Sequence, residues 1–451
     1  FNGVRKRISK SIKSDCRMSK RYHSYKDSGV EWIGEIPSHW TKSKLKFVSE
    51  IVTGNTPSTK DGDNYKGGEH LWVKPNEIKG LIPTNDTNQK LTEKGKSLSR
   101  VLPPFSVLVN GIGRIGEFGY SEKYVSTNQQ INSIVYNQRV DKRFGLFHTS
   151  VMKEGFLFNS EKVVVPILNK TKQENLEFVL PPLSEQRQIV SYLNTKTSLI
   201  DSLIQKTQRK IELLKEKRTS LINEVVTKGL NPNVEMKDSG VEWIGEIPSH
   251  WMIGKLYQYS EMCNGSTPSR VKPEYWENGT IPWMSSGEIN KKKIREIESR
   301  ITQEGFDNSS TKLLPIGTVM MGLNGQGKTK GTVGILEIET TCNQSLCGMV
   351  FNDDMYPMFS FYFLDSQYYY IRGLVGEGQR EGISVSFLGR YPLVIPPISE
   401  QQQIVEYLDE QTQLTDNTIY IEKKRIELLK EYRQSLISEV VTGKLKVTTD
   451  E

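Results

Sequence analysis

The sequence contains one unit twice, and this repeat constrains the fold more than any other feature. The fifteen residues KDSGVEWIGEIPSHW occur at 26–40 and again at 237–251, 211 positions later. Shorter matches follow in the same order: Gly54–Ser58 and Gly265–Ser269 (GxTPS), Trp72 and Trp283, Gly116 and Gly331, Asn128-Gln129 and Asn343-Gln344, and Pro181–Leu193 and Pro396–Leu408 (PPxSEQ). The ends match while the middles, 41–177 and 252–392, have diverged. This indicates a duplicated scaffold that carries two different modules.

Each repeat ends in a predicted long helix. No Gly or Pro occurs from Ser184 to Lys228, with Ser184 as the expected N-cap and Gly229 as the stop signal. The second helix is expected from Ser399 to Thr442. Mostly apolar residues recur three and four apart, the pattern of a coiled-coil seam. They are Val190, Leu193, Thr197, Ile200, Ile204, Thr207, Ile211, Leu214, Arg218, Leu221 and Val225, then Val405, Leu408, Thr412, Thr415, Ile419, Glu422, Ile426, Leu429, Arg433, Leu436 and Val440.

Such a seam has to be covered, and the simplest cover is pairing of the two helices with each other. That pairing leaves room for a further partner. The polar seam positions Arg218, Glu422 and Arg433 suggest devices that fix the register, or contacts with another chain.

The middles carry short runs rich in β-branched residues, with many Gly and Pro between them. Strands are expected at Ser106–Val109, Gln130–Val135, Thr318–Met321 and Leu346–Val350. The predicted fold is α+β, with two mixed α/β domains separated by two long antiparallel coiled-coil helices in a pseudo-two-fold repeat. We expect a disordered basic tail at 1–25, domain 1 at 26–180, helix one at 181–230, domain 2 at 237–395, and helix two at 396–445.

Net charge gives only weak evidence for a nucleic-acid partner. The chain carries +7, but residues 1–17 supply six basic side chains and one acidic side chain, which leaves +2 elsewhere. Met18 is the expected natural start and 1–17 a leader, with a DNA-binding arm as the alternative. Cys16, Cys263, Cys342 and Cys347 show no metal-ligand spacing, and no apolar run is long enough for a membrane helix. A cytoplasmic protein without metal or membrane is expected.

The motifs together resemble the specificity-subunit family of type I restriction–modification systems. The DSGVEWIGEIPSHW opening, the GxTPS turn, the Trp-x4-Glu-Ile segment, the Gly-rich loop followed by Asn-Gln, and the PPxSEQ helix entry occur in the family's order, twice. The resemblance covers nearly all of the chain after residue 18.

The resemblance implies a non-catalytic subunit whose two target-recognition domains each recognise one half of a bipartite, asymmetric site on double-stranded DNA. It also implies two adenine-N6 methyltransferase subunits and added restriction subunits as partners. S-adenosylmethionine and ATP are then expected only on those partners. Near its end, domain 2 keeps a family loop with Gln379 and Arg380 as candidate contacts, whereas domain 1 has Val163–Leu168 there.

Two phosphate-binding patterns occur without their structural context. Gly322–Thr329 fits GxxxxGKT, but Gly and β-branched residues follow it instead of a helix, and Gly111–Gly116 fits GxGxxG without a downstream acid. We interpret both as Gly-rich loops that bring a basic side chain to the DNA backbone: Arg114 in one domain, Lys328 or Lys330 in the other. The alternative is an ordinary hairpin turn.

Candidate base readers are expected where the two domains disagree, because different half-sites need different readers. These positions are Lys74 and Asn76 against Ser285 and Ser286, and Lys60 against Arg270 or Lys272. Asn128, Gln129, Asn343 and Gln344 are shared, which favours a structural or backbone-contact role. Trp40, Trp72, Trp251 and Trp283 are expected to anchor the core, and His39 and His250 to be structural.

Two other function classes fit the sequence less well. A catalytic nucleic-acid enzyme, such as an ATPase or a fused methyltransferase, needs a catalytic domain that the chain has no room for. No Asn- or Asp-Pro-Pro-aromatic motif occurs, and Leu102–Phe105 lacks the polar first residue. A purely structural coiled-coil protein does not explain two diverged modules between matched ends.

Overall fold

The structure is a computed structural model that describes residues 21–160, 166–325, 327–373 and 382–447. It consists of two compact units, residues 1–206 with 425–451 and residues 207–424. Unit 1 therefore holds domain 1, and unit 2 holds domain 2. Each unit also includes part of both long helices, α7 (Leu183–Lys228) and α13 (Ile398–Val441). Within the described residues, no helix combines the length and apolar character needed to cross a membrane.

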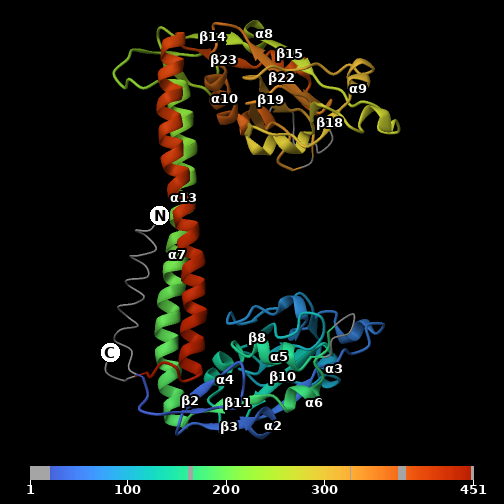
Figure 1. Cartoon of the computed structure of the whole chain (residues 1–451), viewed down its shortest axis with the longest axis vertical. Helices are drawn as coiled ribbons and strands as arrows, with labels where there is room; N and C mark the ends of the chain where they lie inside the picture. Colours follow the sequence, from blue (N-terminus) through green and yellow to red (C-terminus); the bar gives the residue numbers. More distant parts are fainter. Residues whose placement is uncertain (1–20, 161–165, 326, 374–381, 448–451) are drawn as a thin grey trace. The chain divides into compact units, whose positions relative to one another are not determined.

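Domain 1 is built from small sheets flanked by short helices (Figure 1). The largest has the order β4 (Ser49–Thr53), β10 (Ile131–Tyr136), β7 (Val107–Asn110) and β8 (Phe118–Tyr120), all antiparallel. A second sheet has the order β6 (Lys90–Leu91), β5 (His70–Val73) and β9 (Val125–Thr127). Two-stranded pairs are β1 (Tyr25–Asp27) with β2 (Glu35–Pro37) and β3 (Thr41–Lys44) with β11 (Glu177–Leu180). The helices are α2 (Leu45–Val48), α3 (Glu93–Ser97), α4 (Lys142–Thr149), α5 (Lys153–Phe158) and α6 (Lys170–Glu174).

Domain 2 repeats this plan. Its main sheet has the order β15 (Ser260–Asn264), β22 (Leu346–Phe351), β19 (Val319–Gly322), β20 (Val333–Leu336) and β17 (Lys293–Ile294). The second sheet is β18 (Arg300–Ile301), β16 (Ile281–Met284) and β21 (Thr341–Cys342). The pairs are β12 (Met236–Asp238) with β13 (Glu246–Pro248) and β14 (Met252–Lys255) with β23 (Pro392–Ile395). The helices are α8 (Leu256–Tyr259), α9 (Gln303–Asp307), α10 (Pro357–Ser366), α11 (Tyr368–Gly373) and α12 (Val385–Gly389).

The predicted α+β class, the four predicted strands and the two long helices are confirmed. Both helices begin one residue earlier than predicted, and the second ends one residue earlier. Ser184 is therefore inside the first turn and the prediction that it caps the helix was wrong, because the chain already turns helical after the Pro181-Pro182 pair. At the other end Gly229, with φ +75°, stops the helix as predicted.

All members of the predicted seam are buried or half-buried in both helices. In unit 1, Arg433 of α13 pairs with Asp201 of α7, with Nε 2.9 Å from Oδ1. In unit 2, Arg218 of α7 lies 3.3 Å from Asp416, and Lys210 donates to the buried carboxylate of Glu422 at 2.6 Å. Each polar seam residue thus has a partner on the opposite helix, which supports a role in fixing the register of an antiparallel pair.

A second apolar face of the helices, absent from the prediction, packs into the domains. Ile189, Ile437 and Val441 join the core of unit 1, and Ile222, Val226 and Ile404 join that of unit 2. These residues lie next to seam positions, so the apolar stripe is wider than a two-helix seam requires. In each unit the helices therefore share a core cluster with the domain, rather than forming a separate segment.

The PPxSEQ entry attaches each domain to its helix through two polar side chains. His39 Nε2 lies 2.9 Å from the Glu185 carboxylate, and His250 Nε2 lies 2.7 Å from that of Glu400. The next residue, Gln186, is fully buried and binds the backbone at Arg139, Asp141 and Pro181. Gln401 makes the equivalent bonds to Asp354, Tyr356 and Pro396. This contact explains why both repeats carry the same Glu-Gln pair, and it fits the structural role expected for the two histidines.

The disordered tail expected over 1–25 differs from the structure at its last residues. Tyr22 donates a hydrogen bond to Glu185 and packs its ring 6.0 Å from Trp40, and Tyr25 begins β1. An aromatic side chain that can bury its ring and satisfy its hydroxyl folds onto the domain. Residues 1–20 lie outside the described residues.

Candidate nucleic-acid interface

The GxTPS turn lies against the strand that leads into Asn-Gln, and its glycine makes this approach possible. A Cβ atom at Gly54 would lie 2.2 Å from the carbonyl oxygen of Asn128. One at Gly265 would lie 2.0 Å from the carbonyl oxygen of Cys342. Neither position can hold a larger residue without moving the backbone, so both domains need glycine there for packing.

The shared Asn and Gln have different tasks. The Asn128 Oδ1 accepts from the backbone N–H of Gln130 at 3.2 Å, and the Asn343 Oδ1 accepts from that of Ser345 at 3.1 Å. The Gln side chains are exposed, and each Oε1 accepts a hydrogen bond from the threonine of the GxTPS turn: Thr56 to Gln129, and Thr267 to Gln344 at 2.6 Å. The asparagines therefore shape a local turn, and the glutamines join two surface segments. These bonds support a structural role, and DNA contact by the glutamines stays a prediction.

A buried tryptophan supports the turn from below in each domain. Trp72 Nε1 donates to the Asn55 carbonyl at 3.2 Å, and Trp283 Nε1 donates to the Ser266 carbonyl at 3.0 Å. A second aromatic ring packs edge-on against each: Tyr65 at 5.7 Å and Trp276 at 5.0 Å. Trp40, Trp72, Trp251 and Trp283 are all almost fully buried, so the prediction that they anchor the core is confirmed.

The Gly-rich loops meet the Asn-Gln segments. They join antiparallel strands, β7 to β8 in domain 1 and β19 to β20 in domain 2. The Gly111 N–H donates to the Gln130 carbonyl and the Leu323 N–H to the Ser345 carbonyl, both at 2.8 Å. Three motifs that are far apart in sequence therefore share one edge in each domain. We call the GxTPS turn, the Asn-Gln pair and the Gly-rich loop the recognition edge.

The GxxxxGKT match is not a nucleotide-binding loop in this fold. After Thr329 the chain makes a turn and enters β20 at Val333, as predicted, rather than starting a helix. The loop backbone is held by Arg372 of α11, whose Nη1 donates to the carbonyls of Gly327 at 2.9 Å and Lys330 at 2.7 Å. Sequence reasoning missed Arg372, because its only signal was a lone arginine in a short aromatic helix.

The basic candidates lie in different surroundings along the recognition edges. Arg114 is exposed at the tip of its loop, with Nη1 3.4 Å from the Glu117 carboxylate. Lys328 is exposed and Lys330 half-buried.

The candidate base readers also differ in exposure. Lys60 and Asn76 are exposed, whereas Ser285 and Ser286 are half-buried at the start of a 3-10 turn. Gln379, Arg380 and part of the divergent Val163–Leu168 segment lie outside the described residues.

Lys74, Arg270 and Lys272 each lie against an aromatic ring. The Lys74 Nζ is 5.0 Å from the Trp72 ring and the Lys272 Nζ is 4.8 Å from the Tyr275 ring. Arg270 lies 4.7 Å from Trp276 and 5.4 Å from Trp283. An edge with exposed amides, Gly-rich loops and cations on aromatic rings offers hydrogen bonds and charge to a nucleic acid.

Comparison with known proteins agrees with this arrangement. Residues 37–213 and 248–431 both match the family model of the type I restriction modification DNA specificity domain. The chain belongs to the type I restriction–modification specificity-subunit family. The resemblance predicted from the motifs is thereby confirmed, and the chain is a DNA-specificity subunit, the DNA-recognition component of such a system.

Full-length relatives of this family share modest identity with the chain. The MjaIX specificity subunit of Methanocaldococcus jannaschii is 25% identical over 92% of this chain and 95% of its own length. The EcoR124I/EcoR124II specificity subunit of Escherichia coli is 29% identical over 46% of this chain and 50% of its own length.

Solved structures share the fold. The HsdS subunit from Thermoanaerobacter tengcongensis covers 91% of this chain and 98% of that chain, with 16% identity and a TM-score of 0.55. A chain from a study of complex assembly and conformational transition of the type I R-M system covers 90% and 98%, with 15% identity and a TM-score of 0.70.

Proposed function

We propose that this specificity subunit recognises a bipartite, asymmetric site on double-stranded DNA, with one half-site for each domain. The observation that carries the proposal is the recognition edge, which is built twice on matched bonds yet presents different side chains. Gly54 and Gly265, Trp72 and Trp283, and the Thr–Gln contacts are equivalent. The cations around them are not equivalent. A pseudo-repeated protein with unlike edges calls for two unlike half-sites.

Exchange of one domain tests this proposal directly. Residues 41–177 are replaced by the matching segment of a relative with a different target, and the complex is expressed with its methyltransferase partner. Methylome sequencing should then report a new half-site on one side of the motif and the original half-site on the other. A motif altered in both halves would contradict independent recognition by the two domains.

We propose further that the long helices bind two adenine-N6 methyltransferase subunits, one for each half, to which restriction subunits can be added. Leu199 in unit 1 and Leu414 in unit 2 stand at equivalent positions of α7 and α13. The two residues are 59% and 54% exposed on the helix surface, outside the seam. Exposed leucines repeated in this way suit a partner that docks twice.

Charge substitution at these leucines tests that docking. Leu199→Glu or Leu414→Glu alone should leave one methyltransferase subunit bound, and the double variant should leave none, as measured by native mass spectrometry. Ser198→Glu serves as a control on an exposed neighbouring position. Retention of two partner subunits by the double variant would place the docking surface elsewhere.

The helices also set the spacer between the half-sites in this proposal, since α7 is one continuous helix of 46 residues, about 69 Å long. Duplication of Ile204–Lys210 and Ile419–Arg425 inserts one heptad into each helix and preserves the seam. Seven residues add about 10 Å, close to three base pairs at roughly 3.4 Å each. The methylated motif should gain about that spacer, with weaker activity because the second half-site also rotates. Full activity at the original spacer would refute the spacer role.

The subunit itself is proposed to be non-catalytic, with S-adenosylmethionine and ATP bound only by partner subunits. The hairpin context of Lys328 supports this for ATP. Neither the wild-type chain nor Lys328→Ala should bind ATP in calorimetry, and the isolated chain should not transfer methyl groups. Tight ATP binding that Lys328→Ala abolishes would revive a nucleotide site.

A further inference from the structure

Beside each recognition edge, one cation lies on the buried tryptophan that supports the GxTPS turn. In domain 1 the Lys74 Nζ lies 5.0 Å from the Trp72 ring, and in domain 2 the Arg270 guanidinium lies 5.4 Å from the Trp283 ring. The negative face of an indole attracts a cation. The buried tryptophan is therefore a common platform, and each domain places a positive charge beside it.

The two cations come from different positions of the repeat. Lys74 directly follows β5, and the equivalent residue 211 positions later is Ser285. Arg270 directly follows the GxTPS turn, and the equivalent residue in domain 1 is Thr59. Each domain therefore carries its cation at only one of these two positions. The cation lies at a different place in each domain, beside the same tryptophan.

A second contact orients each cation. The Lys74 Nζ donates to the Gln89 Oε1 at 2.7 Å, and Arg270 also lies 4.7 Å from Trp276, whose ring is at 88° to that of Trp283. The neighbouring cation Lys272 lies on a different ring, that of Tyr275, and its Nζ donates to the Tyr275 hydroxyl at 3.0 Å. Lys74 and Arg270 are thus held in defined positions before any DNA is bound.

We propose that Lys74 and Arg270 are the specificity-determining cations of the two domains, each contacting a guanine in its own half-site. Lysine and arginine bind the O6 and N7 acceptors of guanine in the major groove. A side chain held in place beforehand loses little freedom on binding. A cation at a different place beside the tryptophan selects a guanine at a different position of the half-site, whereas the shared Asn-Gln pair cannot distinguish the half-sites. The inference rests on the proposed bipartite recognition and names the groups that carry it.

The test uses the full chain in complex with its methyltransferase partner. Methylome sequencing first gives the wild-type motif, and binding is then measured on duplexes that carry this motif with each base pair changed in turn. The variants are Arg270→Thr and Lys74→Ser, which install the other domain's residue. Lys272→Thr is the matched control, because it removes a nearby cation that faces a different ring.

Arg270→Thr should lose discrimination at one guanine of the half-site assigned to domain 2 by about 5- to 150-fold, with the other half-site unchanged. Lys74→Ser should do the same for domain 1, and Lys272→Thr should spare every position. Arg270→Lys retains the charge and should keep most of the discrimination. If Arg270→Thr does not fold, Thr59→Arg combined with Lys74→Ser in domain 1 should move the preferred position within that half-site.

Two kinds of failure are distinguishable. Equal weakening on all duplexes with a salt slope lower by about one would make these cations phosphate contacts, and an unchanged motif would make them structural; either result overturns the inference alone. A wild-type complex without a bipartite motif would overturn the proposed function itself.

Discussion

Domains 1 and 2 share the Glu, Gln and His contacts that attach each of them to the long helices, but a further set of side chains at each junction differs. In domain 2 the junction is polar: the Tyr362 hydroxyl donates to Asp409 at 2.6 Å, and the Lys293 Nζ lies 3.5 Å from the same carboxylate. Lys292 pairs with Asp365 as well. In domain 1 the equivalent positions are Phe147, Asn194, Ile82, Leu81 and Ser150.

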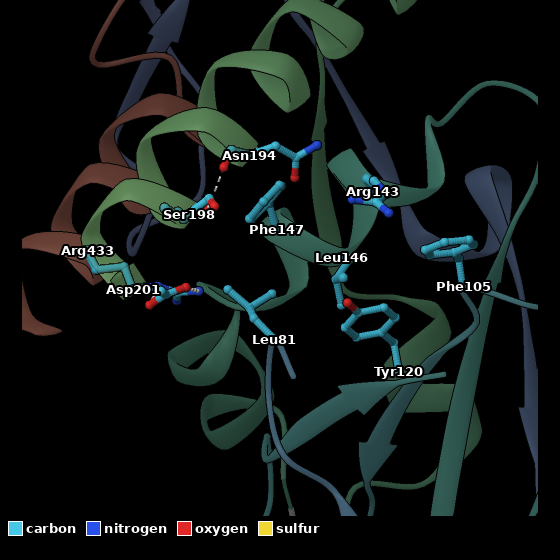
Figure 2. A pocket seen from close by; sticks show the side chains of 11 residues that line it. Leu81, Phe105, Tyr120, Arg143, Leu146, Phe147, Asn194, Ser198, Asp201 and Arg433 are labelled. Carbon is cyan, nitrogen blue, oxygen red and sulfur yellow. Dashed lines mark hydrogen bonds and ion pairs between the residues drawn. The ribbon is translucent and has the colours of Figure 1, made fainter. Parts of the chain in front are cut away.

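Each junction borders an open cleft at the same place in the repeat. The cleft of unit 1 has a volume of about 440 Å³ and is lined by Leu81, Phe147 and Asn194 (Figure 2). The cleft of unit 2, about 630 Å³, is lined by Lys292, Tyr362 and Asp409. The backbone contacts of Gln186 and Gln401 and the two His–Glu pairs occur in both units. The bonds to Asp409 are specific to unit 2, because unit 1 has Asn194 at the equivalent position. The comparison therefore separates what the duplicated scaffold requires from what each domain can alter.

The largest effect is expected where the two junctions are identical. Gln186→Ala leaves the Asp141 N–H and the carbonyls of Arg139 and Pro181 without their side-chain partner and should cost about 2–4 kcal/mol in unit 1. Gln401→Ala should cost a similar amount in unit 2. Hydrogen exchange should localise each loss to its own unit, with the exposed neighbours Gln188→Ala and Gln402→Ala as controls. Equal destabilisation of both units by one substitution would contradict separate junctions.

The second largest effect is expected in the pH dependence of stability, which should differ between the two domains. His148 of α4 is fully buried, its ring centre is 4.1 Å from that of Phe178, and among the described residues neither ring nitrogen has a hydrogen-bond partner. Burial lowers the pKa of His148 to about 3. The unfolded chain takes up a proton near pH 6.5 that the folded domain refuses, so stability is full above pH 6.5 and falls toward pH 3.

The expected loss in unit 1 is about 2 kcal/mol between pH 6.5 and pH 5. Domain 2 has Phe363 at this position, so His148→Phe should remove the dependence and Phe363→His should introduce it in unit 2. Urea unfolding followed by hydrogen exchange at both pH values measures the difference. A slope that persists in His148→Phe would assign it to another group.

Replacing a residue of the polar domain 2 junction by its domain 1 equivalent should lower the stability of unit 2 only modestly. Tyr362→Phe removes the hydroxyl bond to Asp409 and should cost about 1 kcal/mol in unit 2, with little change in unit 1. The wild-type domain 2 junction should also weaken with added salt, because the Lys293–Asp409 pair is partly exposed. Hydrogen exchange of α10 and α4 at low and high salt tests both statements. Salt-sensitive exchange of α4 alone would show that the domain 1 junction, and not that of domain 2, depends on charge.

The smallest effect is expected at the tips of the Gly-rich loops. Arg114→Ala should weaken binding to all sequences alike and lower the salt slope by about one, if Arg114 contacts phosphate. Arg372→Ala should not lower that slope, since Arg372 holds the loop of domain 2 through backbone carbonyls. Salt titrations on one duplex compare the two. Loss of preference at a single base pair in Arg114→Ala would make Arg114 a base reader.

Much of the architecture follows from the sequence because its signals are local or repeated. The absence of Gly and Pro and the three-four spacing of apolar residues predict the two helices. This pattern does not depend on what packs beside them. The duplication marks the scaffold by identity alone. It also drew attention to Asn128-Gln129 and the GxTPS turn, although it gave no hint that Thr56 and Gln129 are bonded to each other.

The tertiary structure decided which of these marked residues meet and what each one does. Spacing cannot show that Gln186 holds a loop 45 residues away, that Arg372 fixes a distant Gly-rich loop, or that Lys74 and Arg270 serve the same tryptophan from different positions. Such contacts join segments that are far apart in the sequence, and no periodic pattern in the sequence predicts which of these segments meet. By itself the sequence therefore determined the duplicated α+β scaffold, its two helices and its family. Folding alone assembled the recognition edges, because hydrogen bonds and aromatic contacts act over a few ångströms and arise only once distant segments have packed.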